Sequence, residues 1–234
     1  MLDHRLSLAA SLYVPCRLGC DIGSDHALLP CHLLRSGTCE RMIVSDISEK
    51  ALMHAAYQVH HQHLEDRVQL ICADGLEAVT EPCGCISITG MGGETAAQIL
   101  LSGQDRLHGC TLVISVHTDP FFTRQAIEKI GYRFTAEKLV YERGRYYMVW
   151  QCVPGFMHQT EEEVLYGSLL YTQPSELLTA YLQFRISVYK KKLTGLLSGR
   201  APKAEEIAEA ERALHFYQAR LQKLGGRDDA SIDE

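Results

Sequence analysis

The chain has 234 residues, of which 46% are hydrophobic and 22% are charged. This composition is typical of globular proteins and excludes a fibrous or largely disordered one. The length suffices for one large domain, or one of ordinary size with an appendage, and neither needs a metal or disulfide to fold. The formal net charge of −6 means that an anionic partner must be met by a local basic patch.

The sequence shows no signal for a membrane or for secretion. No stretch approaches the roughly 20 apolar residues of a membrane span, and the N-terminus lacks a basic leader followed by an apolar run. The nine cysteines are scattered and odd in number, which favours free thiols. Cys83 and Cys85 are separated by one residue, which is closer than the usual spacing of zinc ligands, and the sequence has no second pair to complete a site, so we expect no metal. These observations predict a cytoplasmic protein.

Short runs rich in Val, Ile, Leu and Cys recur along the first half of the chain, separated by stretches long enough for helices. Such alternation predicts a parallel sheet covered on both faces. The expected strands are 16–22, 42–45, 68–73, 85–89 and 111–116. The expected helices include 48–62, with Ser48 as N-cap, 94–101 and 120–130.

Two extended, aromatic-rich segments follow, at 133–142 and 145–153, and Gly144 separates them. This pattern predicts an antiparallel hairpin that completes the sheet. Five parallel strands closed by a hairpin is the strand order of class I methyltransferases. The fold class we expect is therefore α/β, with a Rossmann-like methyltransferase sheet.

From Thr160 the composition changes to helix formers, with a break near 199–202. The short break predicts a C-terminal two-helix coiled-coil hairpin, although the helices could instead pack on the main domain as extra core. We expect domains at 1–158 and 159–226, and a flexible tail at 227–234. The expected apolar seams consist of Leu178, Leu182, Tyr189, Leu193 and Leu196 on the first helix, and Ile207, Ala210, Leu214, Tyr217, Leu221 and Leu224 on the second.

Cations concentrate near the end of the first of these helices. They are Arg185, Lys190, Lys191, Lys192 and Arg200. Most charge runs are solvated faces, but in an acidic protein such a cluster favours contact with phosphate groups.

The turn DIGSD at 21–25 follows the first strand. Backbone N–H groups are expected to be free where a parallel strand meets its helix, and Gly23 allows close approach of a ligand. An acidic turn with one glycine suits a cationic sulfonium cofactor better than the pyrophosphate of a dinucleotide, which needs three spaced glycines. The turn therefore favours S-adenosylmethionine, bound by Asp21, Ile22, Gly23 and Ser24.

Acids also end the next two strands, and each could alternatively be a helix cap. Asp46, followed by Ile47, is placed to hold ribose hydroxyls, and Asp74 with Gly75 could bracket an adenine edge. Three acids at successive strand ends predict a nucleoside site.

The segment TGMGG at 89–93 lies at the end of the fourth expected strand, so it is expected next to the same pocket. Gly90 is expected on the cofactor side. The glycines leave room for a flat acceptor, and Met91 could lie against an apolar ring, so Met91, Gly92 and Gly93 are expected to border the substrate.

The motifs CDIGSDHALLP, VSDIS, ADGLE and ITGMGG, with their order and gaps, resemble the bacterial tRNA adenine-22 N1-methyltransferases. The later segments GYRFTAEKLVYERGRYYMV and YGSLL with two helices are similar to that family's hairpin and C-terminal domain. The resemblance covers essentially the whole chain. It implies methyl transfer from S-adenosylmethionine to N1 of adenine 22, with the helical hairpin gripping the tRNA. It also implies that Asp25, His26 and Pro30 face the acceptor.

One loop departs from the family pattern. After the fifth strand the family typically has Gln-Pro-Asn, whereas this chain has Ser115, Val116 and His117. Contacts from this loop to base or cofactor are therefore not carried over.

Neutral adenine presents a lone pair at N1, so alignment matters more than a strong base. A carboxylate would stabilise the cationic product and could accept a proton, a role we assign to Asp25 with His26 as second candidate. The alternative is that Asp25 caps the following helix and His26 packs structurally. Other functions to weigh are methylation of another RNA or nucleobase, and a non-catalytic adaptor. The expected oligomeric state is a monomer or weak dimer.

Overall fold

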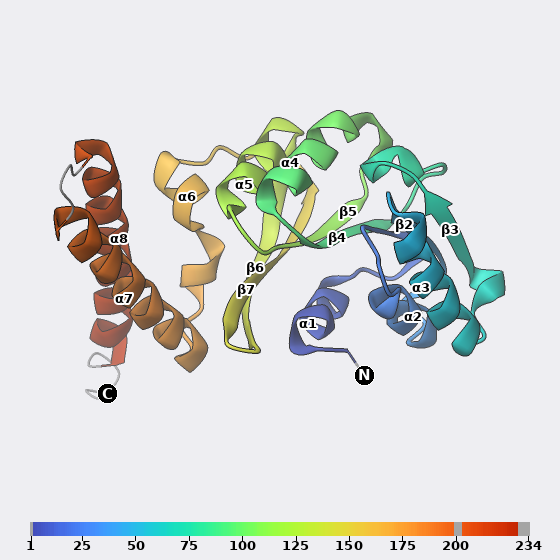
Figure 1. Ribbon diagram of the computed structural model, residues 1–234, viewed down its shortest axis with the longest axis horizontal. Helices are drawn as coiled ribbons and strands as arrows, with labels where there is room; N and C mark the ends of the chain where they lie inside the picture. The colour runs from blue at the N-terminus through green and yellow to red at the C-terminus, as the bar shows by residue number, and fades with distance from the viewer. Residues whose placement is uncertain (1, 199–202, 229–234) are drawn as a thin grey trace. The chain divides into compact units, whose positions relative to one another are not determined.

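The computed structural model describes residues 2–198 and 203–228, and its centre is a sheet of seven strands (Figure 1). The strand order is β3-β2-β1-β4-β5-β7-β6, which confirms the predicted Rossmann-like α/β fold. The strands are β1 Cys16–Ile22, β2 Cys39–Asp46, β3 Val68–Cys72, β4 Cys85–Met91, β5 Thr111–Val116, β6 Tyr132–Glu142 and β7 Arg145–Pro154.

The sheet has a reversal point between β1 and β4. Strand β1 pairs in parallel with β2 on one side and with β4 on the other, so the chain crosses the sheet after β3. Strand β7 runs antiparallel between β5 and β6, as the predicted hairpin requires. In open parallel sheets, ligands bind outside the carboxyl ends of the strands at such a reversal. The turns after β1 and β4 therefore meet at the expected site.

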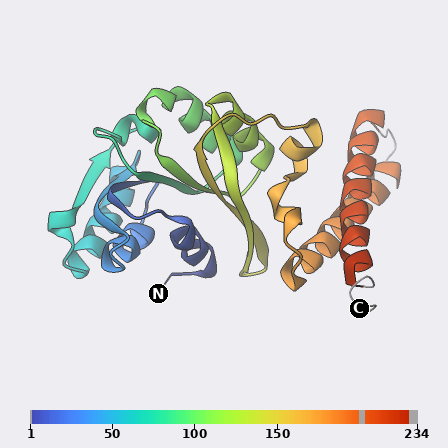
Figure 2. The ribbon, with the colours of Figure 1, turned by 180° about the vertical axis from the view of Figure 1, so that it is seen from behind.

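Helices cover both faces of the sheet, as two separate clusters of buried side chains indicate (Figures 1 and 2). Leu6, Leu33 and Ala55 bury one face beneath α1 His4–Leu12, α2 Leu28–Arg35 and α3 Glu49–His61. Leu100 and Ile127 bury the other beneath α4 Gly93–Ser102 and α5 Pro120–Lys129. Short 3-10 turns lie at η1 Glu65–Arg67, η2 Gly75–Ala78, η3 Gln104–Arg106 and η4 Leu169–Thr172.

Helix α1 positions the N-terminal segment beside the hairpin. Asp3 caps the helix by accepting the N–H of Leu6 at 2.7 Å. At its other end, the side-chain amide of Gln151 on β7 donates to the carbonyl of Leu12 at 2.7 Å. This docking brings Arg5 to the same edge of the sheet as the turn after β1. This helix is not among those predicted from the sequence.

The boundary between compact units lies after Leu169, whereas we expected one at 158. Helix α6, Glu161–Tyr166, belongs to the first unit because Arg124 on α5 donates to the carbonyl of Val164 at 3.3 Å. Thr160 and Glu163 form a capping box that begins this helix. The change to helix formers at Thr160 therefore precedes the change of unit.

The second unit consists mainly of α7 Glu176–Ser198 and α8 Ala204–Asp228, which pack on each other. Of the predicted seams, Leu178, Leu182, Ala210 and Tyr217 are buried. The ring of Tyr217 stacks on that of Tyr189 with centroids 5.8 Å apart. Arg227 and Asp228 of the predicted tail belong to the last turn of α8, whereas the break at 199–202 and the rest of the tail, 229–234, lie outside the described residues.

Two further predictions concern cysteines and membranes. All nine cysteines are free thiols, as expected. Within the described ranges, no helix combines the length and the apolar character that crossing a membrane requires.

Candidate active site

A cleft of about 280 Å³ opens at the carboxyl ends of β1 and β4. Its lining combines three segments: the turn after β1, the end of β4 with His117 beyond β5, and the start of α1. Of the residues predicted from the sequence, the cleft brings together Asp21, Gly23, Ser24, Asp25, His26 and Gly90. The remaining lining residues are Asp3, Arg5, Leu6, Ala27, Leu28, Leu29, Thr89 and His117.

Asp21 is a buried carboxylate at the floor of this cleft, with only 4% of its surface exposed. The hydroxyl of Ser87 on β4 donates to its Oδ1 at 2.5 Å. Burial raises the pKa of Asp21 to about 6, although hydrogen bonds from Ser87 and Ser24 and the charge of Arg5 act in the opposite direction. A buried, incompletely compensated anion next to an open cleft favours a cationic ligand.

The turn after β1 differs from the expectation in its backbone hydrogen bonds. The N–H groups of Gly23 and Ser24 both donate to the carbonyl of Ser45, at 2.8 and 2.9 Å. These groups are thus engaged in holding the turn against β2, and the expectation that they are free for a ligand was wrong. Gly23 has φ +75°, a left-handed conformation that favours glycine. Ile22, just before it, is buried in β1.

Asp46 and Asp74 lie at the ends of β2 and β3, the next strands outward from β1. Oδ1 of Asp46 accepts the N–H of Ser48 at 2.8 Å, and Asp74 precedes the η2 turn with its side chain exposed. Ile47 is 70% exposed, so its apolar surface is free to contact a flat ring. Gly75 is buried against Ile99. The predicted nucleoside residues thus lie along one edge of the sheet, outside the lining of the cleft itself.

The glycines after β4 serve different purposes. A Cβ on Gly93 would lie 2.2 Å from the carbonyl oxygen of Asp119, so this glycine is required by packing. A Cβ on Gly92 would lie 3.2 Å from Oγ1 of Thr118, and Met91 packs beneath Gly23. Only Gly90 of the three glycines lines the cleft. The expectation that all of 90–93 leaves room for an acceptor was therefore too broad.

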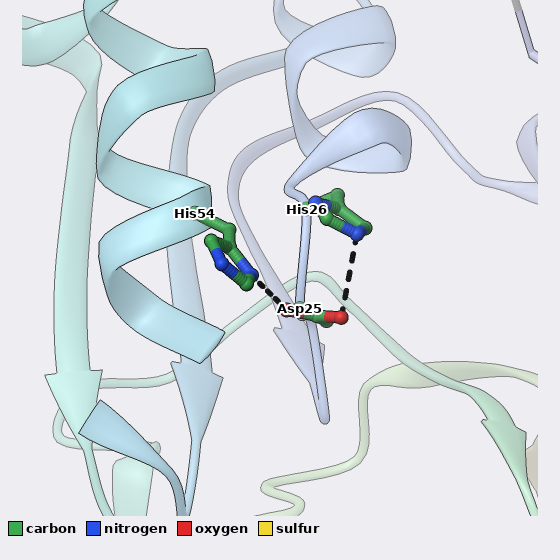
Figure 3. Close-up of side chains that lie close together, drawn as sticks. All are labelled: Asp25, His26 and His54. Atoms are coloured by element: carbon green, nitrogen blue, oxygen red, sulfur yellow. Dashed lines mark hydrogen bonds and ion pairs between the residues drawn. The ribbon is translucent and has the colours of Figure 1, made fainter. Parts of the chain in front are cut away.

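Asp25 and His26 project from the turn at the rim of the cleft (Figure 3). The N-cap of α2 is Ala27, with no side-chain capping bond, so Asp25 does not cap this helix. Oδ1 of Asp25 instead lies 2.9 Å from Nδ1 of His54 on α3. This hydrogen bond, together with the nearby His26, His54 and Lys50, lowers the pKa of Asp25. His26 is 59% exposed, which contradicts a packing role.

Pro30 does not line the cleft. It is buried in the first turn of α2, where a missing N–H carries no cost. Pro30 therefore does not face the cleft in which the acceptor was expected.

Arg5 is a site residue that sequence reasoning missed. Its Nη1 atom is buried and has no hydrogen-bond partner among the described residues, yet Arg5 lines the cleft opposite Gly90. Its guanidinium also lies over the ring of Tyr147, 5.9 Å from the centroid. No local signal in the sequence marks Arg5, because its position depends on how α1 docks against the hairpin.

His117 occupies the loop that departs from the family pattern. It lines the cleft, and its ring meets that of Tyr147 edge-on at 5.3 Å. Partial burial and the charges of Arg5 and Arg145 lower its pKa, so the neutral imidazole is favoured. Ser115 and Val116 are buried in β5 and take no part in the lining.

The predicted phosphate-binding cations are only partly available. Lys190, Lys191 and Lys192 are exposed on α7, and Lys192 lies 3.6 Å from a carboxylate oxygen of Glu209. Arg185, by contrast, packs over the rings of Tyr189 and Tyr217. Arg200 lies outside the described residues.

Comparison with known proteins supplies the context of this site. The profile of a family described as tRNA (adenine(22)-N(1))-methyltransferase, TrmK, matches residues 19–218. The tRNA (adenine(22)-N(1))-methyltransferase of Bacillus subtilis is 31% identical over 150 residues. That alignment spans 63% of this chain and 63% of the relative.

Solved structures resemble the chain over nearly its whole length. Sp1610 of Streptococcus pneumoniae, in complex with S-adenosyl-L-methionine, is 25% identical and has a TM-score of 0.85, covering 94% of this chain and 100% of that one. TrmK of M. capricolum, in complex with S-adenosyl-homocysteine, is 24% identical, and its TM-score of 0.82 shows the same fold. That match covers 95% of this chain and 98% of the other.

Proposed function

This chain belongs to the tRNA (adenine(22)-N(1))-methyltransferase family, and on that premise we propose that it methylates N1 of adenine 22 in tRNA, with S-adenosylmethionine as methyl donor. The observation that carries the proposal is the buried carboxylate of Asp21 at the floor of an open cleft, at the reversal point of the sheet. The cofactor's amino and sulfonium groups are cations that such a carboxylate attracts.

The chain's own residues fit this cofactor. We assign Asp46 and Ile47 to the ribose and the face of its adenine, and Asp74 with Gly75 to the adenine edge, all at the ends of strands next to the cleft. The cofactor's methionine part also carries a carboxylate, and Nη1 of Arg5, which has no partner within 2–198 and 203–228, offers it a charge-assisted hydrogen bond. We assign Arg5 to that carboxylate and Asp21 to the ammonium group.

When bound, S-adenosylmethionine supplies a methyl group whose bond to sulfur breaks as the bond to N1 forms, and the positive charge passes from sulfur to adenine. The Asp25 carboxylate, at the rim of the same cleft, stabilises the charge that arrives on the base. Its lowered pKa makes it a weak proton acceptor, so we assign it an electrostatic role in place of acid–base catalysis. We propose that the flat base lies in the same cleft beside His117, whose ring meets that of Tyr147 edge-on, while Gly90 borders the cofactor.

The tRNA must present adenine 22 outside its stack, because N1 is otherwise inaccessible in a paired base. We propose that the α7–α8 unit contacts the tRNA backbone through Lys190, Lys191 and Lys192. We propose that the protein acts on tRNA in the cytoplasm. We propose that it acts as a monomer or weak dimer.

The test is transfer of tritiated methyl from S-adenosylmethionine into two transcripts of one tRNA, with adenine or guanine at position 22. Label in the adenine transcript alone supports the proposal. Equal label in both would indicate another position or another RNA substrate. No label, with the cofactor still bound, would indicate a non-catalytic adaptor and would refute the proposed activity.

A further inference from the structure

Three side chains with metal-ligand chemistry meet at the rim of the cleft: Asp25, His26 and His54 (Figure 3). Nδ1 of His54 lies 2.9 Å from Oδ1 of Asp25, and Nε2 of His26 lies 3.4 Å from Oδ2. One potential ligand atom from each residue falls within 4.8 Å of the other two. The side chains are 47% to 59% exposed, so an ion from solvent can reach them.

Different parts of the fold bring these residues together. Asp25 and His26 belong to the turn between β1 and α2, whereas His54 lies on α3. The two imidazole rings are stacked, with centroids 5.2 Å apart and an interplanar angle of 17°. The carboxylate of Asp25 faces both rings, as Figure 3 shows. The arrangement is thus a convergence of two elements, and sequence spacing alone does not reveal it.

The donor set determines which ion would bind. Two imidazole nitrogens with one carboxylate suit zinc and its transition-metal neighbours, whereas calcium and magnesium prefer oxygen ligands. Tetrahedral zinc with bonds of about 2.0–2.1 Å separates its ligand atoms by roughly 3.3 Å. The observed separations of 2.9 and 3.4 Å, which run to the two different oxygens of Asp25, lie near this value, and the one-atom-per-residue set lies within 4.8 Å.

We propose that Asp25, His26 and His54 form a binding site for one zinc-class divalent ion. Three protein ligands leave a fourth coordination position open to water. Lys50, one turn before His54 on α3, adds a positive charge near Asp25 and opposes the ion. The absence of metal expected from the sequence considered only the cysteines, whereas this site uses none of them.

The first test is equilibrium dialysis of zinc chloride against the full chain, without cofactor or tRNA and with the thiols reduced. The wild type should bind one ion at this site. His54→Ala should bind it at least tenfold more weakly, because one of three ligands is lost. His61→Ala is the matched control, since His61 is an exposed histidine on the same helix, and it should bind like the wild type.

A second measurement guards against binding by thiols. Cobalt chloride should produce visible absorption bands in the wild type and in Cys72→Ser, which lacks the exposed cysteine, but not in His54→Ala. Zinc affinity that is the same in His54→Ala as in the wild type would overturn the proposal. So would bands that disappear with Cys72→Ser, or no binding at all.

Occupancy of the site has a consequence that rests on the proposed function. An ion held by Asp25 would remove the carboxylate assigned to the acceptor base, so zinc should inhibit methyl transfer and a chelator should restore it. His54→Ala should resist this inhibition. The dialysis experiment needs no methylation, so the failure of the metal site and the failure of the proposed activity remain distinguishable.

Discussion

The hydroxyl of Ser87 on β4 donates to Oδ1 of Asp21 on β1 over 2.5 Å, so the two strands at the reversal point of the sheet jointly hold one buried carboxylate. A buried charge lowers stability unless a ligand compensates it. Ionised Asp21 therefore lowers the stability of the unliganded protein and, by the same charge, attracts a cationic ligand.

Ionisation of the buried Asp21 carboxylate lowers the stability of the folded protein. The pKa of Asp21 rises from 3.8 to about 6 on folding. Protonated Asp21 therefore stabilises the folded state relative to ionised Asp21; this stabilisation is fully present below about pH 4 and is lost as pH rises through 6. Above pH 6 the ionised carboxylate costs about 3 kcal/mol. Asp21→Asn should therefore raise the free energy of unfolding at pH 8, and the gain should vanish near pH 4. Urea unfolding at both values measures this, and a pH-independent difference would contradict it.

The same residue sets the pH dependence of cofactor binding. If the ionised carboxylate holds the cofactor's ammonium group, affinity should fall up to tenfold per pH unit below about pH 6. In Asp21→Asn the affinity should be at least tenfold weaker at pH 8, and its dependence on pH in this range should disappear. Calorimetric titration with S-adenosylmethionine gives both quantities. Unchanged affinity in the variant would exclude Asp21 from the site.

Arg5 provides a separate test of cofactor orientation. A hydrogen bond to a charged group contributes about 1.5–3 kcal/mol, so Arg5→Ala should weaken S-adenosylmethionine binding by roughly 10-fold to 150-fold. Decarboxylated S-adenosylmethionine, which lacks the carboxylate, should bind Arg5→Ala and the wild type about equally. Arg17→Ala, an exposed arginine on β1, is the control. Equal losses for both cofactors would mean that Arg5 acts on something other than the carboxylate.

Most of the fold could be predicted from the sequence because its signals are local. Apolar runs at regular intervals specify the parallel strands, and Gly144 marks the hairpin that closes the sheet. The boundary between the units was harder to place. Helix α6 has the composition of the C-terminal helices, but its carbonyls accept from Arg124, which is distant in sequence.

The site was predictable only in part, because some of its residues are brought together by contacts that are distant in sequence. Asp21 and Gly23 follow a strand and so carry a local signal. Arg5 and His54 reach the cleft or its rim through the docking of α1 and α3, which no spacing encodes. Gly93 was assigned to the substrate from its place in a glycine-rich motif, whereas the structure explains this glycine by its close packing on Asp119.

The assignment of Asp25 gives a kinetic prediction. Asp25→Asn keeps the shape of the side chain but removes the charge that stabilises methylated adenine. Single-turnover methylation should slow by about tenfold or more, while affinity for S-adenosylmethionine stays within twofold, because we assign Asp25 to the acceptor base and not to the cofactor. Asp66→Asn, an exposed acid in η1, should leave both values unchanged. An unaltered rate in Asp25→Asn would refute the electrostatic role.

The ion pair between Arg124 and Glu137 predicts a stability effect away from the cleft. Nη2 of Arg124 lies 2.7 Å from Oε1 of Glu137, and both side chains are at least 96% buried. Glu137 also accepts from Nε1 of Trp150 at 3.1 Å. Arg124→Ala leaves the buried Glu137 carboxylate without the guanidinium charge that compensates it, and should cost about 3–5 kcal/mol in urea unfolding.

The exposed Arg143 near Glu142 is the matched comparison. Arg143→Ala should cost less than about 1 kcal/mol, because exposed ion pairs contribute little. Similar losses for the two arginines would contradict the importance assigned to the buried pair.

Locating the modified nucleoside in the tRNA decides whether adenine 22 is methylated at N1. The wild-type protein should be incubated with S-adenosylmethionine and an unmodified tRNA transcript that has adenine at position 22, followed by nuclease digestion and mass spectrometry. If adenine 22 is the target, 1-methyladenosine should appear in the fragment that contains position 22 and in no other fragment. A methyl group on another atom or at another position, or none at all, would contradict methylation of adenine 22 at N1.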